Sequence, residues 1–172
     1  HRDLHLSIRR QRQMCIRDSH EAVLYNRLSE MGVPVADIRF PTFGGAMSCI
    51  LQLSSIPREG IINDALMMMM SCPWNNAKMS VAISHDTDIS SAAAVYHAIA
   101  TRCDPSRDMF IVDRTRGSLW DPSAKLIPDD PSGHRVVGKV GIDATIKARH
   151  DVQDFELAWP EGWDEAKLED YV

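Results

Sequence analysis

Two carboxylates and a histidine directly follow the clearest strand signal in the sequence. Residues 78–84 read Lys-Met-Ser-Val-Ala-Ile-Ser, and His85, Asp86 and Asp88 come next. Open α/β sheets place ligand-binding loops at the carboxyl ends of their strands, and hard cations such as Mg²⁺ and Mn²⁺ prefer oxygen ligands. A metal site is one interpretation. We favour the other, in which these residues form a turn and cap the next helix at its positive end.

A second candidate lies closer to the carboxyl end of the chain, where residues 138–145 read Gly-Lys-Val-Gly-Ile-Asp-Ala-Thr. Backbone N–H groups of such a segment could contact a phosphate. We favour instead a turn that enters a buried strand or helix. The sequence has neither a dinucleotide fingerprint nor a Walker A motif to support the phosphate interpretation.

The other reactive side chains predict structural roles. Cys49, Cys72 and Cys103 have no base at a diagnostic spacing, so none is expected to act as a nucleophile. His97 lies on a predicted helix among alanines and is expected to be packed or half-exposed. Four charged residues around one turn predict ion pairs and caps rather than catalysis: Arg102, Asp104, Arg107 and Asp108.

The cysteines also bear on metal binding and on the cellular compartment. With Cys15 they number four, and they are far apart, with no CxxC pair. This spacing argues against zinc. Because no signal peptide is visible and the chain is large enough to build a core without disulfides, we predict free thiols in a cytoplasmic protein.

Length and composition indicate one globular domain. The chain has 172 residues, of which 44% are hydrophobic and 25% charged, and its longest apolar run, 65–70, is too short to span a bilayer. The net charge is −5: residues 1–19 hold five Arg and two Asp (+3), which leaves −8 on residues 20–172. This acidic body argues against nucleic-acid binding, unless the basic N-terminal arm binds alone.

Residues 1–19 differ from the rest of the chain. They show neither a helical nor a strand period, and residues 9–19 resemble translated sequencing-adapter sequence. We predict a non-native or disordered segment; a genuine basic arm and a targeting segment are the alternatives. On the favoured interpretation the native chain begins within a gene near His20, and the protein is a fragment.

The body of the chain alternates predicted helices and strands. Helical periodicity predicts helices over 21–31, 61–71 and 90–100, the last capped by Ser90 or Ser91, and short apolar runs predict strands over 33–40, 47–53, 78–84 and 109–112. Residues 113–141, rich in Gly, Pro and Asp, predict a long loop. The predicted fold class is α/β: a layered sandwich with a mixed, partly parallel sheet, helices packed on it, a long loop and a C-terminal tail.

Two apolar features predict contacts. Met67 to Met70 cover more than one face of their helix, which predicts a place in the core or, as the alternative, at a subunit interface. Residues 151–172 hold eight acids and one Lys, together with Trp159, Trp163 and Tyr171. We expect this acidic, aromatic-anchored tail to lie across a partner surface.

Several strings, taken in order, resemble the C-terminal domain of the UbiD-type decarboxylases, the prenylated-FMN-dependent carboxy-lyases. The most specific are Thr-Arg-Cys-Asp-Pro-Ser-Arg-Asp at 101–108 and Gly-Ile-Asp-Ala-Thr at 141–145. Weaker matches are His-Glu-Ala at 20–22, the strand near Ile50, the helix after Gly60, and residues 78–89. The resemblance spans residues 20–150, which we expect to be an α/β domain between the segment 1–19 and the tail 151–172.

The resemblance implies decarboxylation, sometimes reversible, of aromatic or α,β-unsaturated carboxylic acids. It implies prenylated FMN, a divalent cation (Mn or Mg) and often K⁺ in the complete enzyme. In that family the catalytic Arg and acids, and most cofactor ligands, precede this domain, so we predict no catalytic, cofactor-binding or metal residue here. Many relatives also have a Lys pair where this chain reads Ser54-Ser55-Ile56.

Two functions remain open at this point. The first is a C-terminal fragment of a UbiD-like decarboxylase, in which this domain supports homo-oligomerisation and closure of the active site. The alternative is a stand-alone, non-catalytic binding or assembly module of the same fold.

Overall fold

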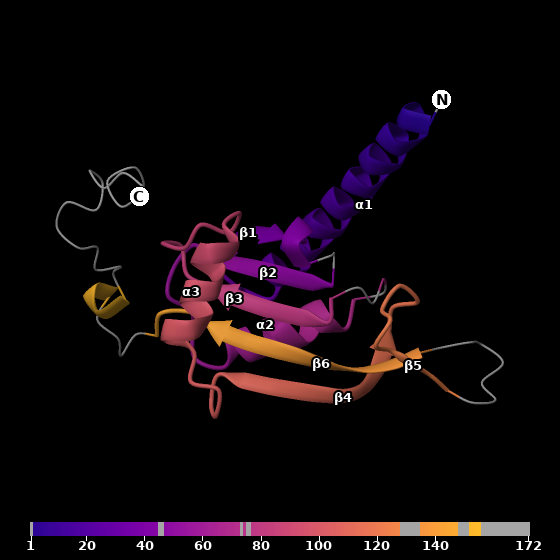
Figure 1. The fold of residues 1–172 in the computed structure, drawn as a ribbon. Helices are drawn as coiled ribbons and strands as arrows, with labels where there is room; N and C mark the ends of the chain where they lie inside the picture. Colours follow the sequence, from indigo (N-terminus) through magenta and orange to yellow (C-terminus); the bar gives the residue numbers. More distant parts are fainter. Residues whose placement is uncertain are drawn as a thin grey trace, which may run out of the picture.

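A mixed β-sheet forms the centre of the molecule (Figure 1). The computed structural model describes residues 2–44, 47–72, 74, 77–127, 135–147 and 152–155, and their side chains except those of residues 2–15, 152 and 154. The helices are α1 (Arg2–Glu30), α2 (Ile61–Met70) and α3 (Ala92–Arg102), with 3-10 turns η1 (Thr42–Gly44) and η2 (Val152–Phe155). The strands are β1 (Val35–Arg39), β2 (Ser48–Leu53), β3 (Met79–Ile83), β4 (Met109–Gly117), β5 (Lys125–Leu126) and β6 (Arg135–Ala144).

The sheet is parallel in its centre and antiparallel at its edges. Its order is β1-β2-β3-β6-β4, with β5 paired to the amino end of β6. β2, β3 and β6 run parallel, whereas β1 and β4 pair antiparallel with their neighbours. Parallel strands need crossover connections, and α2 supplies the one between β2 and β3. This arrangement confirms the predicted layered α/β fold with a mixed, partly parallel sheet.

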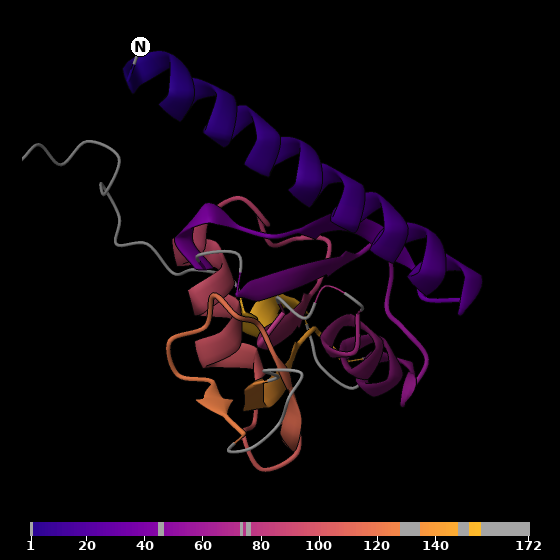
Figure 2. The same cartoon turned by 90° about the vertical axis from the view of Figure 1, so that its right-hand side faces the viewer.

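The two faces of the sheet build two separate cores. One core joins β2 to α1 and α2, and its fully buried members include Leu24, Leu28, Leu51, Leu66 and Met69. The other joins the opposite face to α3 and includes Ile50, Val81, Ile83, Val95 and Ile142. Figure 2 shows α2 and α3 on opposite sides of the sheet. Because side chains alternate along a strand and both faces are covered, β2 and β3 are nearly continuous apolar runs.

The prediction of a long loop over residues 113–141 is wrong at both ends. β4 continues to Gly117, and β6 begins at Arg135 and lies between β3 and β4. Gly138 and Gly141 weaken the strand signal, but Gly141 has a packing role. A Cβ at Gly141 would lie only 2.5 Å from the ring of Phe110, its partner on β4. Residues 138–144 therefore belong to a largely buried strand, and Gly141 makes room for an aromatic ring.

Helix α1 begins at Arg2, well before its predicted start at residue 21. Arg, Gln, Leu and Met are good helix formers. The predicted start relied on an apolar stripe along the helix. The first part of α1 projects beyond the sheet, so it has no core to face and needs no such stripe (Figure 2). The helix ends as predicted, because Gly32 adopts a φ of 81° and the N–H of Val33 bonds to the carbonyl of Leu28. The non-native origin of residues 1–19 stays a prediction.

The methionines of α2 divide between core and surface. Met69 and Met70 are buried, Met68 is half-buried and Met67 is 45% exposed. The core prediction is therefore confirmed for Met69 and Met70, and the interface prediction remains for Met67. Among the described residues, no helix is both long and apolar enough to span a membrane.

We predict that Gly141→Ala destabilises the protein, because the added methyl group would overlap the Phe110 ring. The free energy of unfolding, measured by urea denaturation, should fall by about 1–3 kcal/mol. The matched control is Gly138→Ala in the same strand, where a Cβ would meet neighbours only at 3.8 Å. That control should be neutral or slightly stabilising. Equal losses in both variants would contradict this role for Gly141.

We also predict that Met69→Asp lowers the free energy of unfolding by about 3 kcal/mol or more, because it buries an unpaired carboxylate. Met67→Asp on the same helix should lose far less, since that side chain is partly in water. Thermal denaturation followed by circular dichroism would measure both. Similar melting temperatures for the two variants would show that the core is not where we place it.

Candidate functional site

The carboxyl ends of β2, β3 and β6 meet at one edge of the sheet, where α/β folds place their ligand sites. Residues 84–88 follow β3, and residues 145–147 follow β6. The two loops are joined directly, because the Ser84 hydroxyl accepts a hydrogen bond of 2.7 Å from the N–H of Ile146. This carboxyl edge therefore brings together the two motifs that the sequence singled out.

Asp86 forms a two-point ion pair with Arg102 at the end of α3. The guanidinium nitrogens lie 2.9 and 2.7 Å from the two carboxylate oxygens, and Nη1 also donates to the Thr87 hydroxyl at 3.1 Å. Desolvation raises the pKa of Asp86, but the hydrogen bonds and charge of Arg102 outweigh it, so the pKa lies below its usual value. The Arg102 side chain is only 6% exposed. The pair therefore ties the loop after β3 to α3.

Asp88 and Ser91 form the turn and cap that the sequence favoured. Asp88 accepts hydrogen bonds from the backbone N–H and the hydroxyl of Ser90, at 2.9 and 2.7 Å. The Ser91 hydroxyl accepts from the N–H of Ala94 at 3.2 Å and caps α3. The carboxylates of Asp86 and Asp88 thus hold different partners.

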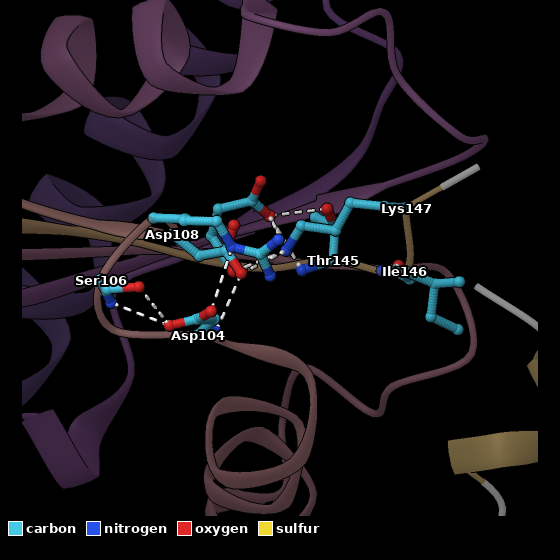
Figure 3. Close-up of polar contacts among 9 residues, drawn as sticks. Asp104, Ser106, Asp108, Thr145, Ile146 and Lys147 are labelled. Atoms are coloured by element: carbon cyan, nitrogen blue, oxygen red, sulfur yellow. Dashed lines mark hydrogen bonds and ion pairs between the residues drawn. The ribbon is translucent and has the colours of Figure 1, made fainter. Parts of the chain in front are cut away.

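A second polar cluster surrounds Lys147 (Figure 3). Its ammonium lies 3.4 Å from Asp108 and 3.5 Å from Asp143, and it donates to the carbonyl of Asp143 at 3.1 Å. Asp143 also accepts from the N–H and hydroxyl of Thr145, at 2.9 and 2.6 Å. The side chains of Lys147, Asp108 and Asp143 are all 15% exposed or less. The cluster links the start of β4 to the end of β6.

The predicted group of four charged residues is split in two by the structure. Asp104 pairs with Arg107 at 3.0 Å, and its backbone N–H donates to Asp108 at 2.9 Å (Figure 3). Arg102, in contrast, turns away to Asp86. The structural interpretation is confirmed for these ion pairs and caps, but the grouping of Arg102 with the other three is wrong.

The side chains at this edge do not fit a divalent cation. Among the described residues, no group of three or more His, Cys, Asp or Glu side chains could hold a metal ion. Asp86 already holds a guanidinium, and Asp88 caps a turn. Nor does the segment Ser54-Ser55-Ile56 offer a cation to a flavin phosphate. We therefore derive no catalytic step through a metal or a flavin on these residues.

The three thiols that the structure describes are not activated. Cys49, Cys72 and Cys103 form no disulfide, as predicted; the side chain of Cys15 is outside the described residues. Desolvation raises the pKa of Cys72 to about 11 and also raises those of Cys49 and Cys103. The thiolate is the nucleophilic form, so these cysteines are protonated near neutral pH. His97 is half-buried on α3, within the predicted range.

Lys147 and Lys139 are two polar residues whose roles the sequence did not reveal. Lys147 follows Asp143 by four residues, and this spacing was a readable signal for a pair. Lys139 stands inside the glycine-bearing strand β6, is 2% exposed, and donates to the carbonyl of Met70 at 2.6 Å. No sequence signal predicted that contact, because it joins residues far apart in the chain.

Comparisons with known proteins agree with this geometry. A family model described as the 3-octaprenyl-4-hydroxybenzoate carboxy-lyase C-terminal domain (UbiD_C) matches residues 13–144. An anhydromevalonate phosphate decarboxylase of Archaeoglobus fulgidus is 30% identical over 136 residues, which cover 79% of this chain and 29% of that protein.

Solved structures give the same correspondence. The UbiD-class enzyme HmfF from Pelotomaculum thermopropionicum, in complex with FMN, is 30% identical with a TM-score of 0.66, covering 89% of this chain and 32% of that one. An evolved dimeric form of HmfF in complex with prFMN is 25% identical with a TM-score of 0.55, covering 89% and 29%. This chain thus spans less than a third of the length of these relatives.

We predict that Asp86→Asn destabilises the protein by about 2 kcal/mol, because it leaves the buried Arg102 without a counter-charge. Asp88→Asn is the matched control and should cost much less, because Asp88 holds the N–H and hydroxyl of Ser90 rather than a buried cation. Because folding lowers the pKa of Asp86, its contribution is present above the ordinary value of about 3.9 and is lost as the pH falls through the lower folded value. Urea denaturation at pH 7 and at pH 3 should show the difference between wild type and Asp86→Asn shrink at the lower pH. A difference that grows there would contradict the ion pair.

Proposed function

Because this chain belongs to the C-terminal domain family of the UbiD-type carboxy-lyases, we propose that it is the C-terminal part of a decarboxylase. Its parent acts on aromatic or α,β-unsaturated carboxylic acids, and this part serves oligomerisation and closure of the active site. The observation that carries the proposal is the partial coverage of the relatives. The family model matches residues 13–144, and the matched part is less than a third of the length of the relatives.

The reactive residues of the parent lie, on this proposal, in the part of the enzyme that precedes this domain. The polar contacts of the carboxyl edge support it. Asp86, Asp108 and Asp143 are engaged by cations or backbone groups that hold loops together. A general acid or base needs a side chain that can reach a substrate proton. These carboxylates instead fix the shape of the domain.

The proposal of an assembly role is supported by large apolar side chains in water. Trp120 is 84% exposed, Ile111 76% and Leu119 72%, on β4 and the connection that follows it. Exposed apolar surface of this kind is typical of a face that another domain or subunit covers. Met67 on α2 adds a further exposed apolar side chain.

The cofactors belong to the proposed parent. FMN and prFMN are bound by the HmfF relatives. We propose prenylated FMN with Mn or Mg, and K⁺, for the complete enzyme, held by residues outside this chain. The division into the segment 1–19, the domain 20–150 and the tail 151–172, and a cytoplasmic location, are parts of the same proposal.

We predict that the purified chain, mixed with prenylated FMN and Mn²⁺, releases no CO₂ from cinnamate or 4-hydroxybenzoate. The catalytic side chains and most cofactor ligands are expected elsewhere. Product formation would be followed by chromatography, with a complete UbiD-type enzyme as the positive control. Turnover by this chain alone would overturn the assignment of the chemistry to a preceding part.

The source DNA separates this proposal from the alternative of a stand-alone module. Extension of the reading frame upstream of residue 20 should add a long coding region with an Arg and paired carboxylates. The protein expressed from that frame should be active with the cofactor, and deletion of this domain should abolish the activity. A start codon just before Ser19 would instead support the module.

A further inference from the structure

Lys139 is a buried cation without a carboxylate partner. Its side chain is 2% exposed in the middle of β6, and its ammonium donates one hydrogen bond of 2.6 Å to the carbonyl of Met70. Among the residues that the structure describes, no Asp or Glu forms an ion pair with it. Buried lysines are almost always paired, because an isolated charge is costly to remove from water.

The end of α2 satisfies this charge only in part. The Met70 carbonyl belongs to the last turn of α2, where the helix dipole places about half a negative charge. An ammonium carries a full positive charge and three N–H donors. Within the part of the chain that the structure describes, one carbonyl therefore leaves two donors and much of the charge without a partner.

Lys139 also lines a hollow between α2 and β4. The hollow has a volume of about 540 Å³, and Lys139 lines it together with Met67, Met68, Met70, Val112 and Arg116. This volume lies within the range of small-molecule sites. Arg116 is exposed at the rim and near enough for its charge to lower the pKa of Lys139, an effect that adds to the larger one of desolvation. Among the residues that the structure describes, the lining of the hollow thus combines thioether, aliphatic and hydroxyl side chains with two cations and no acid.

We propose that this hollow binds a small monocarboxylate with an apolar body, whose carboxylate is held by Lys139 and Arg116. A carboxylate would supply the missing counter-charge and accept the free N–H donors of Lys139, since charge-assisted hydrogen bonds are the strong ones. The methionine walls would enclose the apolar body, because flexible thioether side chains adapt to varied shapes. The site is separate from the carboxyl edge of the sheet. It does not depend on the proposed decarboxylase function.

The test uses the full chain without flavin or metal. Methionine methyl groups labelled with ¹³C report on the hollow, and 2-naphthoate is the probe, with neutral 2-naphthamide as its matched control. The methyl signals of Met67 and Met68 should shift on titration with naphthoate and not with naphthamide. Naphthoate should also raise the melting temperature. Because no turnover is measured, the result is independent of any decarboxylase activity.

Three variants sharpen the test. Lys139→Met keeps the length of the side chain and should weaken naphthoate binding by about tenfold or more, as expected for a lost charge-assisted hydrogen bond. Lys125→Met, at an exposed lysine of β5, is the control and should bind normally. Arg116→Gln lies at the exposed rim, so it should fold even if Lys139→Met does not, and it should weaken binding severalfold.

The outcomes that overturn the proposal are specific. Equal shifts of the methyl signals with naphthamide would show that the hollow binds apolar molecules without recognising a carboxylate. Unchanged affinity for naphthoate in Arg116→Gln and Lys139→Met would contradict the proposed site. The absence of any shift of the methyl signals would contradict it as well. If Trp163→Ser moves the Met67 signal in the absence of any probe, the chain's own acidic tail occupies the hollow and the small-molecule proposal fails.

Discussion

The parallel pairing of β3 with β6 is the constraint on which the other contacts depend. It joins Met79 to Val140 and Ile83 to Ala144, and the chain between the two strands contains α3, β4 and β5. Closing so long a loop costs chain entropy, which the burial of both strands must offset. The pairing brings the loops after β3 and β6 together. It also places β6 where β4 can pair with it at the edge of the sheet.

A strand in this position meets strict demands on each face. Toward α3, Ile142 and Ala144 join the apolar core. Toward α2, Gly141 leaves room for Phe110, and Lys139 reaches the last carbonyl of α2. Each demand explains a residue type that looked unlike a strand in the sequence. Gly141 and Lys139, which obscured β6 in the sequence, are the residues that fit it between β3 and β4.

The sequence therefore predicted the fold class and most elements, but not the interior strand β6. Ile83, Leu51 and the capping Ser91 carry local signals, namely apolar runs and a helix cap, and local signals can be read without a partner. A glycine is needed at position 141 because Phe110, thirty-one positions earlier, packs against it, and only the folded structure shows this contact. The carboxyl edge followed the same rule: Asp88 capped its own turn as predicted, whereas the pairing of Asp86 with Arg102 had to be seen in three dimensions.

The contrast between the buried cations of this domain separates architecture from binding. Arg102 and Lys147 are both largely buried, and each has carboxylate partners within the domain, so their charges are balanced and their positions fixed. Lys139 is buried more deeply, but among the described residues its one hydrogen-bond partner is the carbonyl of Met70. Two of the three buried cations are thus neutralised by carboxylates of the same domain. Lys139 instead lies beside a hollow and a second cation, which is the physical reason to expect a ligand there. The ion pairs of the carboxyl edge, in contrast, hold the sheet, and with it the hollow, in shape.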